Sequence, residues 1–336
     1  MLFRSELTKH PDRNVTFAEY SKGFFHWDGE WATDKKVSGR RIGRGYCLDQ
    51  TKSLELHLNP VFGKLKLTDI DRPRIKAFKN EMFRAGYSGS LINKTLYALK
   101  AVLELAEERG IIQAVPRIDR AAERPRKKGI LSLDEVEELF NVPWEDFRGY
   151  VGNLLAASSG IRIGELQALT FDDVHIREGY ITVRRSWDKR THSLTETTKN
   201  GHARTILIPG KVAYEMGRLI TLHPCPTPDS FFFWGEKKPT EKPAEPIYFS
   251  RTLYRALELI GIDDAKRRER NITFHSWRHW LNSLMINAKI PLQKIQSITG
   301  HRTERMTSHY YHLDDMADVR ALQESIFGGE RNEGIN

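Results

Sequence analysis

The chain has 336 residues, of which 39% are hydrophobic and 29% are charged, and its formal net charge is +9. This length predicts about two domains of roughly 150 residues, and the composition excludes disordered and collagen-like chains. The sequence has no apolar run near the ~20 residues that span a bilayer and no apolar core of a secretion signal, and its two cysteines exclude a disulfide framework and a C-x-x-C zinc site.

The excess positive charge is concentrated in the first third of the chain. Residues 1–128 contain 26 Lys and Arg against 16 Asp and Glu, a net charge of +10, whereas residues 129–336 have a net charge of −1. Such a basic region favours a polyanionic partner, with nucleic acid ahead of an acidic membrane surface. The alternative is a solvated basic surface that keeps the protein soluble.

The first elements are predicted to be helices. The first two are expected at residues 16–27 and 46–58. A third follows Pro73 and carries the apolar stripe Ile75, Phe78 and Met82. The fourth begins at an N-cap, Ser88 or Ser90, carries an apolar stripe from Ile92 to Ala106, and ends at Arg109 and Gly110. Residues 16–115 therefore predict a helical domain of about four helices, after an extension over residues 1–15. This start leaves no room in this sequence for a further domain of about sixty residues before it; either the protein lacks such a domain or this sequence does not include it.

Several basic residues of this region are candidate contacts to phosphates. A glycine-containing loop between the first two helices is expected to hold Lys35, Lys36, Arg40, Arg41 and Arg44. The last helix carries Lys94 and Lys100, and the linker that follows carries Arg126, Lys127 and Lys128. The alternative for the loop cluster is an exposed loop without a partner. The linker over residues 116–129 contains two prolines, a terminal glycine and six basic residues, which indicates an extended connection.

The second domain, residues 130–315, is predicted to be mainly helical with a small antiparallel sheet, an α+β fold. Helices are expected from the capping box Ser132–Glu135 to Phe140, through Leu154–Ala156 to Gly160, from Ile161 past Leu169, and from Tyr248 onward except at Pro291 and Gly300. Residues 180–187 and 204–208 alternate like strands, and Lys199-Asn200-Gly201 between them predicts a hairpin turn. In the tail, residues 316–336, a helix at 318–327 packs on its own domain or on a neighbouring subunit.

Six side chains of the second domain form an ordered pattern. The sequence reads Ser159-Gly160-Ile-Arg162-Ile-Gly-Glu165, then Lys199 in the hairpin segment, His275-Ser-Trp-Arg278, Gly300-His301, and Tyr310 nine residues after that histidine. In this order and spacing the chain resembles the tyrosine recombinases, the integrases of phages and mobile elements. Trp277 departs from the smaller residue that is more common inside the H-x-x-R motif, and we expect it to pack in the core.

The resemblance implies a catalytic role for each of these residues. Two guanidiniums, Arg162 and Arg278, would neutralise the phosphate oxygens, because they stay charged and present planar forks of donors. His301 would donate to the phosphate, His275 would act as general acid and base, and Lys199 would protonate the leaving 5′-oxygen. Tyr310 would attack phosphorus and form a 3′-phosphotyrosine. Glu165 would hold Arg162 in place, and Tyr311 is the alternative nucleophile.

The resemblance also implies how the whole protein works. It implies a two-domain DNA clamp whose helical core-binding domain and catalytic domain grip one duplex, at specific attachment sites and as a homotetramer that passes through a Holliday junction. No metal and no other cofactor is expected, accessory DNA-bending proteins are candidate partners, and the expected location is the cytoplasm of a prokaryotic cell, with the nucleoid. The alternatives are a type IB topoisomerase-like relaxing enzyme and a catalytically silent DNA-binding regulator.

Overall fold

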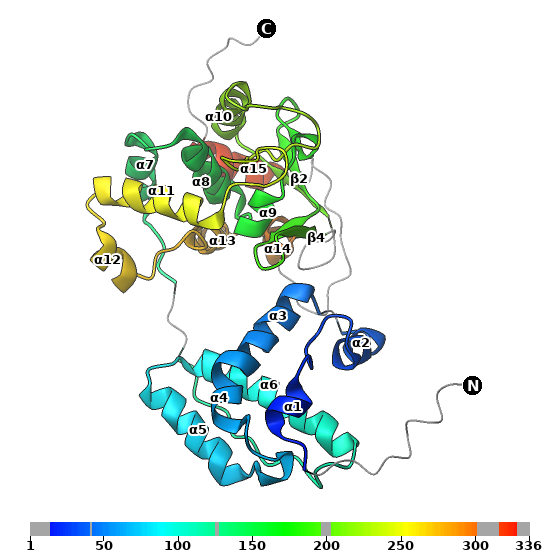
Figure 1. Ribbon diagram of the computed structural model, residues 1–336. Coiled ribbons are helices and arrows are strands. Elements are labelled where there is room, and N and C mark those ends of the chain that lie inside the picture. The colour runs from blue at the N-terminus through cyan, green and yellow to red at the C-terminus, as the bar shows by residue number, and fades with distance from the viewer. Residues whose placement is uncertain (1–13, 41, 125–127, 196–202, 301–315, 328–336) are drawn as a thin grey trace. The chain divides into compact units, whose positions relative to one another are not determined.

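The computed structural model describes residues 14–40, 42–124, 128–195, 203–300 and 316–327. The chain divides into two compact units, residues 1–125 and 126–336. Each unit has its own apolar core. Figure 1 labels the helices and strands of both units. No helix in the described ranges is both long and apolar enough to cross a membrane.

The first unit is entirely helical in its described part. Its elements are α1 (Phe17–Ser21), α2 (Glu30–Val37), α3 (Arg44–Ser53), a π-helical stretch (Leu54–Leu58), α4 (Asn59–Phe62), a 3₁₀ turn (Leu67–Asp69), α5 (Arg72–Arg84) and α6 (Gly89–Glu108). The predicted stripe of α5 is buried, and Ser88 caps α6 by accepting from the backbone N–H of Leu91. Helix α6 is the centre of the unit, because its residues from Ile92 to Ala106 bury one continuous face.

Two helix ends and one additional helix in this unit differ from the predictions. The helix expected to reach residue 27 ends at Ser21, because Gly23 turns the chain with a φ of +70°. The helix expected to end at Leu58 continues to Phe62. Its stretch Leu54–Leu58 is π-helical and lies just before Pro60, which has no backbone N–H to donate to the preceding turn. Residues 30–37, predicted as loop, form helix α2. The unit therefore has six α-helices in its described part rather than about four.

The stretch predicted as linker is anchored at its start. The Asn93 side chain on α6 donates to the carbonyl of Ala121 and accepts from the Ala121 N–H at 3.0 and 2.8 Å. Lys79 on α5 donates to the Asp119 carbonyl at 3.1 Å. These contacts attach the first part of the linker to the helical unit.

The second unit surrounds one long buried helix. Its helices are α7 (Leu133–Asn141), α8 (Phe147–Ser159), α9 (Ile163–Gln167), a 3₁₀ turn (Phe171–Asp173), α10 (Gly210–Thr221), α11 (Pro246–Leu259), α12 (Asp264–Glu269), α13 (Ser276–Asn287), α14 (Leu292–Thr299) and α15 (Ala317–Phe327). Helix α8 packs against α10, α11 and α13, and its residues are almost all buried. Trp277 lies in this core, 2% exposed, and donates its indole N–H to Asn153 of α8 at 2.9 Å, as expected for a core residue.

Two small antiparallel sheets complete the unit and confirm the mainly helical α+β fold. Their strands are β1 (Val174–His175), β2 (Tyr180–Val183), β3 (Ser186–Asp188), β4 (Ser193–Thr195) and β5 (Arg204–Leu207). Strand β2 lies between β1 and β5, with Val183 opposite Arg204, and β3 pairs with β4, with Ser186 opposite Thr195.

The connection between the two predicted strands contains a further hairpin, formed by β3 and β4. It turns at 189–192, where the Asp188 carboxylate accepts the Arg190 backbone N–H and His192 adopts a φ of +48°. The tripeptide at 199–201, predicted as the turn, lies outside the described residues.

The tail helix packs on its own unit. Val319 and Phe327 of α15 are 1% and 4% exposed and belong to the core of the second unit. The buried Gln323 amide donates to the carbonyls of Ser158 and Leu207 at 2.8 and 3.3 Å. Of the two alternatives that the sequence left open, the structure therefore favours docking on the same domain.

Candidate active site

The two guanidiniums expected at the active site are held by neighbouring helix ends. Arg278 of α13 is 2% exposed and donates to the carbonyls of Gly160, at 2.9 Å, and Thr299. Gly160 caps α8 with a φ of +62°, and Thr299 is the last residue of α14. The carbonyls at the end of a helix carry a partial negative charge, so two helix dipoles stabilise this buried cation.

Arg162 lies at the start of α9 and is held by Glu165, as the sequence predicted. Its guanidinium donates to Oε1 of Glu165 at 2.8 Å, and its backbone N–H donates to Oε2 at 3.0 Å. The same guanidinium donates to the carbonyl of Gly300 at 3.1 Å. About a fifth of the Arg162 side chain is exposed, so it retains donors for an incoming ligand.

A third arginine, which the sequence analysis did not select, completes the cluster. Arg204 at the start of β5 donates to both carboxylate oxygens of Glu165, at 3.1 and 2.6 Å, and to the carbonyl of Ile298 at 2.8 Å. A signal was available, because the strand alternation places Arg204 on the same face as the buried Ile206.

The three arginines meet at one helix end. Successive carbonyls of α14 and its cap, those of Ile298, Thr299 and Gly300, accept from Arg204, Arg278 and Arg162 respectively. Carbonyls in the last turn of a helix have no partner within the helix, and here side chains supply one to each. We call this group, with Glu165, the arginine cluster.

The arginine cluster carries more positive than negative charge. Burial and the charges of Arg162 and Arg204 lower the pKa of Arg278 to about 9, while Glu165 opposes that shift. Burial raises the pKa of Glu165, but the hydrogen bond and charge of Arg204 and the charge of Arg162 outweigh it and hold that pKa below its usual value. Three guanidiniums thus share one carboxylate in a largely buried place. An anion such as a phosphate would relieve their repulsion.

His275 lies beside this cluster and is neutral at pH 7. It precedes the first residue of α13, and its ring centroid lies 5.0 Å from that of His279. Although the side chain as a whole is exposed, desolvation of the ring and the charges of His279, Arg278 and Arg162 lower the pKa of His275 to about 4. A neutral imidazole can accept a proton, as a general base must.

Three predicted catalytic residues, Lys199, His301 and Tyr310, lie outside the described residues, as does Tyr311. Gly300, which precedes His301 in the chain, lies in the described part, and its carbonyl accepts a hydrogen bond from Arg162. In the described ranges no three His, Cys, Asp or Glu side chains gather in a way that could hold a metal ion.

The predicted DNA contacts of the first unit are arranged differently from the expected loop. Lys35 and Lys36 lie in the last turn of α2, and Arg44 is the first residue of α3. The Lys36 amine lies 3.8 Å from the ring centroid of Trp27 and donates to that residue's carbonyl. Of the loop cluster only Arg40 lies in the described connection, since Arg41 is outside the described residues.

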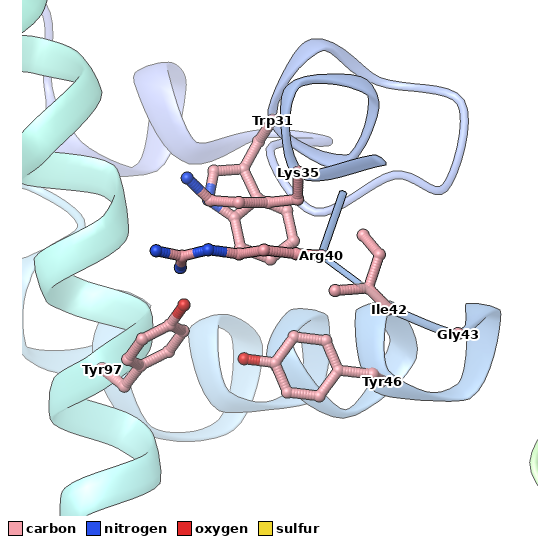
Figure 2. Close-up of a pocket in the computed structure, with 7 residues that line it drawn as sticks. All are labelled: Trp31, Lys35, Arg40, Ile42, Gly43, Tyr46 and Tyr97. Atoms are coloured by element: carbon pink, nitrogen blue, oxygen red, sulfur yellow. The ribbon is translucent and has the colours of Figure 1, made fainter. Parts of the chain in front are cut away.

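Some of these cations line a pocket of about 310 Å³. Its walls come from α2, α3, α6 and the connection between α2 and α3: Trp31, Lys35, Arg40, Ile42, Gly43, Tyr46 and Tyr97. In Figure 2 the Lys35 amine, the Arg40 guanidinium and the two tyrosine hydroxyls all point into the pocket. Burial and a hydrogen bond with Tyr97 raise the pKa of Tyr46, so its phenol stays protonated. We call this the basic pocket.

The other predicted contacts lie on α6 and after the linker. Lys94 and Lys100 are exposed on either side of Tyr97, at helical spacing, and Lys100 pairs with Glu104 at 3.3 Å. Lys128 belongs to the second unit, donates to Asn271 at 3.3 Å and contributes to the low pKa of His275. Arg126 and Lys127 lie outside the described residues.

Comparisons with known proteins show the family and the fold of this chain. The sequence model of the phage integrase family matches residues 130–316. Tyrosine recombinase XerA of Pyrococcus furiosus is 26% identical over 73% of this chain and 79% of its own length, and XerC of Vibrio vulnificus is 23% identical over 84% and 87%. The fold is shared with the Tn1549 transposon integrase in complex with a circular intermediate DNA (TM-score 0.68, 18% identity, 85% of this chain and 96% of that one). It is also shared with a lambda integrase tetramer bound to a Holliday junction (0.65, 17%, 90% and 82%).

Proposed function

Because the chain belongs to the phage integrase family, we infer that it is a tyrosine-type site-specific DNA recombinase, which cuts and rejoins DNA strands. The observation that carries the mechanism is the arginine cluster, with two guanidiniums held on the adjacent carbonyls of Thr299 and Gly300 and a charge that an anion would balance. A scissile phosphate is the anion that such a recombinase binds.

Each proposed catalytic residue then has its own role in strand cleavage and rejoining. Tyr310 attacks phosphorus as its phenolic proton passes to the neutral His275, and the bond from phosphorus to the 5′-oxygen breaks. Lys199 gives a proton to that oxygen, which leaves as a 5′-hydroxyl, while Arg162, Arg278 and His301 bind the non-bridging oxygens. A 5′-hydroxyl from a second duplex then attacks the 3′-phosphotyrosine and restores a phosphodiester. The step needs no external energy, because one phosphate ester replaces another.

We place this activity in the integration or excision of a mobile element, in a prokaryotic cytoplasm. The integrase complexes of Tn1549 and lambda described above support that role, and the lambda tetramer on a Holliday junction supports strand exchange in four subunits. In this proposal both units bind the same duplex, the first through its basic side chains.

A covalent-trapping experiment tests the function. The full chain is incubated in EDTA with short nicked duplexes that tile the DNA flanking its gene, so that the short fragment carrying the released 5′-hydroxyl dissociates and the strand cannot rejoin. We expect a protein–DNA adduct that survives SDS on one of these duplexes. Salt-sensitive binding without an adduct would support a silent regulator, and relaxation of plasmids that lack any flanking sequence would support a topoisomerase-like enzyme.

The basic pocket is proposed to hold one phosphate of the DNA backbone. Lys35 and Arg40 supply positive charge, and the pair of phenols formed by Tyr46 and Tyr97 retains a hydroxyl donor for a phosphate oxygen. The ring of Trp31 gives an apolar wall for the adjoining sugar.

Removal of one pocket cation should weaken DNA binding in a salt-dependent way. If Arg40 neutralises one phosphate, Arg40→Ala should make the negative slope of log K against log salt shallower by about 0.9. Fluorescence anisotropy on the adduct-forming duplex measures this slope. Lys238→Ala removes the same charge from an exposed pair with Glu241 in the other unit and should leave the slope unchanged. Equal slopes for Arg40→Ala and the wild type would refute the pocket contact.

A further inference from the structure

All three nitrogens of the Arg204 guanidinium donate hydrogen bonds within the protein. Its Nη1 and Nη2 donate to the two oxygens of Glu165, and its Nε donates to the Ile298 carbonyl. Only 11% of its side chain is exposed. Because all three nitrogens are engaged, Arg204 is poorly placed to bind substrate directly, in contrast to the more exposed Arg162.

Arg204 holds the Glu165 carboxylate in place, and Glu165 in turn holds Arg162. Oε1 of Glu165 accepts from both Arg162 and Arg204, and Oε2 accepts from Arg204 and from the Arg162 backbone N–H. The fork of Arg204 holds the carboxylate in one orientation, because two parallel hydrogen bonds resist rotation. Glu165 is 1% exposed, so water has little access to replace the lost bonds if Arg204 is removed.

The contact with Ile298 joins the same side chain to the helix end that carries the other two guanidiniums. A shift of Arg204 would therefore disturb Arg162 through Glu165, and both Arg162 and Arg278 through the end of α14. Arg204 also begins β5, five residues after Lys199 in the chain, and opposes Val183 of β2.

We propose that Arg204 is a positioning residue for strand cleavage, which holds Glu165 and the C-terminal end of α14 so that Arg162 and Arg278 face one phosphate. The proposal rests on the recombinase function inferred above. It assigns to Arg204 an effect on the rate of the chemical step rather than on the affinity for DNA. A displacement of about 1 Å at a reacting group can cost roughly 100-fold in rate.

Single-turnover cleavage of the trapped duplex by the full chain tests this role. Arg204→Gln should slow cleavage about 10- to 100-fold, with a DNA dissociation constant within about twofold of the wild type. Arg204→Lys keeps the charge and one bond to Glu165 but loses the fork, so an intermediate rate is expected. If the glutamine variant does not fold, the lysine variant carries the test, and a cleavage rate equal to that of the wild type would overturn the proposal.

Arg185 offers a matched control. It donates from Nη2 to Asp173 and Thr170 at 3.0 and 2.9 Å, and its partner Asp173 is also buried. None of these hydrogen bonds or ion pairs leads to the arginine cluster. Arg185→Gln should lower the melting temperature without slowing cleavage by folded protein. If both variants slow cleavage equally, the effect of Arg204 is general destabilisation and the proposal is wrong.

A double-mutant cycle identifies the route of the effect. If Arg204 acts largely through Glu165, then Arg204→Gln should slow cleavage far less in a Glu165→Gln background than in the wild type. Independent, multiplying effects of the two changes would contradict that route. Wild-type protein without an adduct on any duplex would instead refute the recombinase function, which separates the two failures.

Discussion

Tyr310→Phe is expected to bind the target duplex as tightly as the wild type and to form no covalent adduct. Phenylalanine keeps the ring but lacks the oxygen that we propose attacks phosphorus, so the proposed chemical step would have no nucleophile. Adduct formation on the nicked duplex, read on denaturing gels, should fall below detection. Anisotropy should give a dissociation constant within about twofold, because one neutral hydroxyl contributes little to a salt-dominated affinity.

Tyr311→Phe is the matched control for this assignment. The spacing of nine residues from His301 selects Tyr310, whereas Tyr311 is its immediate neighbour. The Tyr311 variant should therefore retain the adduct. An adduct with Tyr310→Phe that disappears with Tyr311→Phe would reverse the assignment without changing the class of reaction.

Arg278→Lys is expected to slow cleavage by about 100- to 1000-fold while the protein still binds DNA. The guanidinium donates to the carbonyls of Gly160 and Thr299 from two separate nitrogens, which fixes the orientation of its planar fork. A lysine ammonium is a single point with three donors on a flexible stem, and it cannot span the same acceptors. Single-turnover rates at saturating DNA measure the loss.

A second buried arginine separates this catalytic effect from packing. Arg148 of α8 is 9% exposed, donates to the Trp234 carbonyl at 2.7 Å and lies over the Tyr248 ring. Arg148→Lys should destabilise the fold in the same way as Arg278→Lys but leave the cleavage rate nearly unchanged. Comparable rates for the two lysine variants would remove Arg278 from the catalytic set.

The elements that the sequence predicted well are those whose signals are local. Ser132 caps the start of α7, and Gly160 and Gly300 cap the ends of α8 and α14. A capping side chain and a left-handed glycine both act on backbone groups within a few residues. The pairing of Arg162 with Glu165 was also predicted, since the two residues lie three apart at the start of a helix.

Other features leave no local pattern in the sequence, or depend on contacts between residues that lie far apart in the chain. Helix α2 was missed because its buried residues, Trp31 and Ala32, are adjacent and make no stripe, so Lys35 and Lys36 were assigned to a loop. Arg204 was missed because its partners lie 39 and 94 residues away in the chain. Such a residue acquires its role only when strand β5 and helix α14 pack together.

The gathering of three side chains on consecutive carbonyls restricts how α14 can vary. Each residue of an α-helix advances its direction by about 100°. One inserted or deleted residue between Pro291 and Gly300 would therefore rotate all three acceptors away from their donors at once. Substitution is a milder change, since Leu292 at the start of the helix is 57% exposed. We therefore expect natural variants of this segment to differ in identity at exposed positions but to preserve its number of residues.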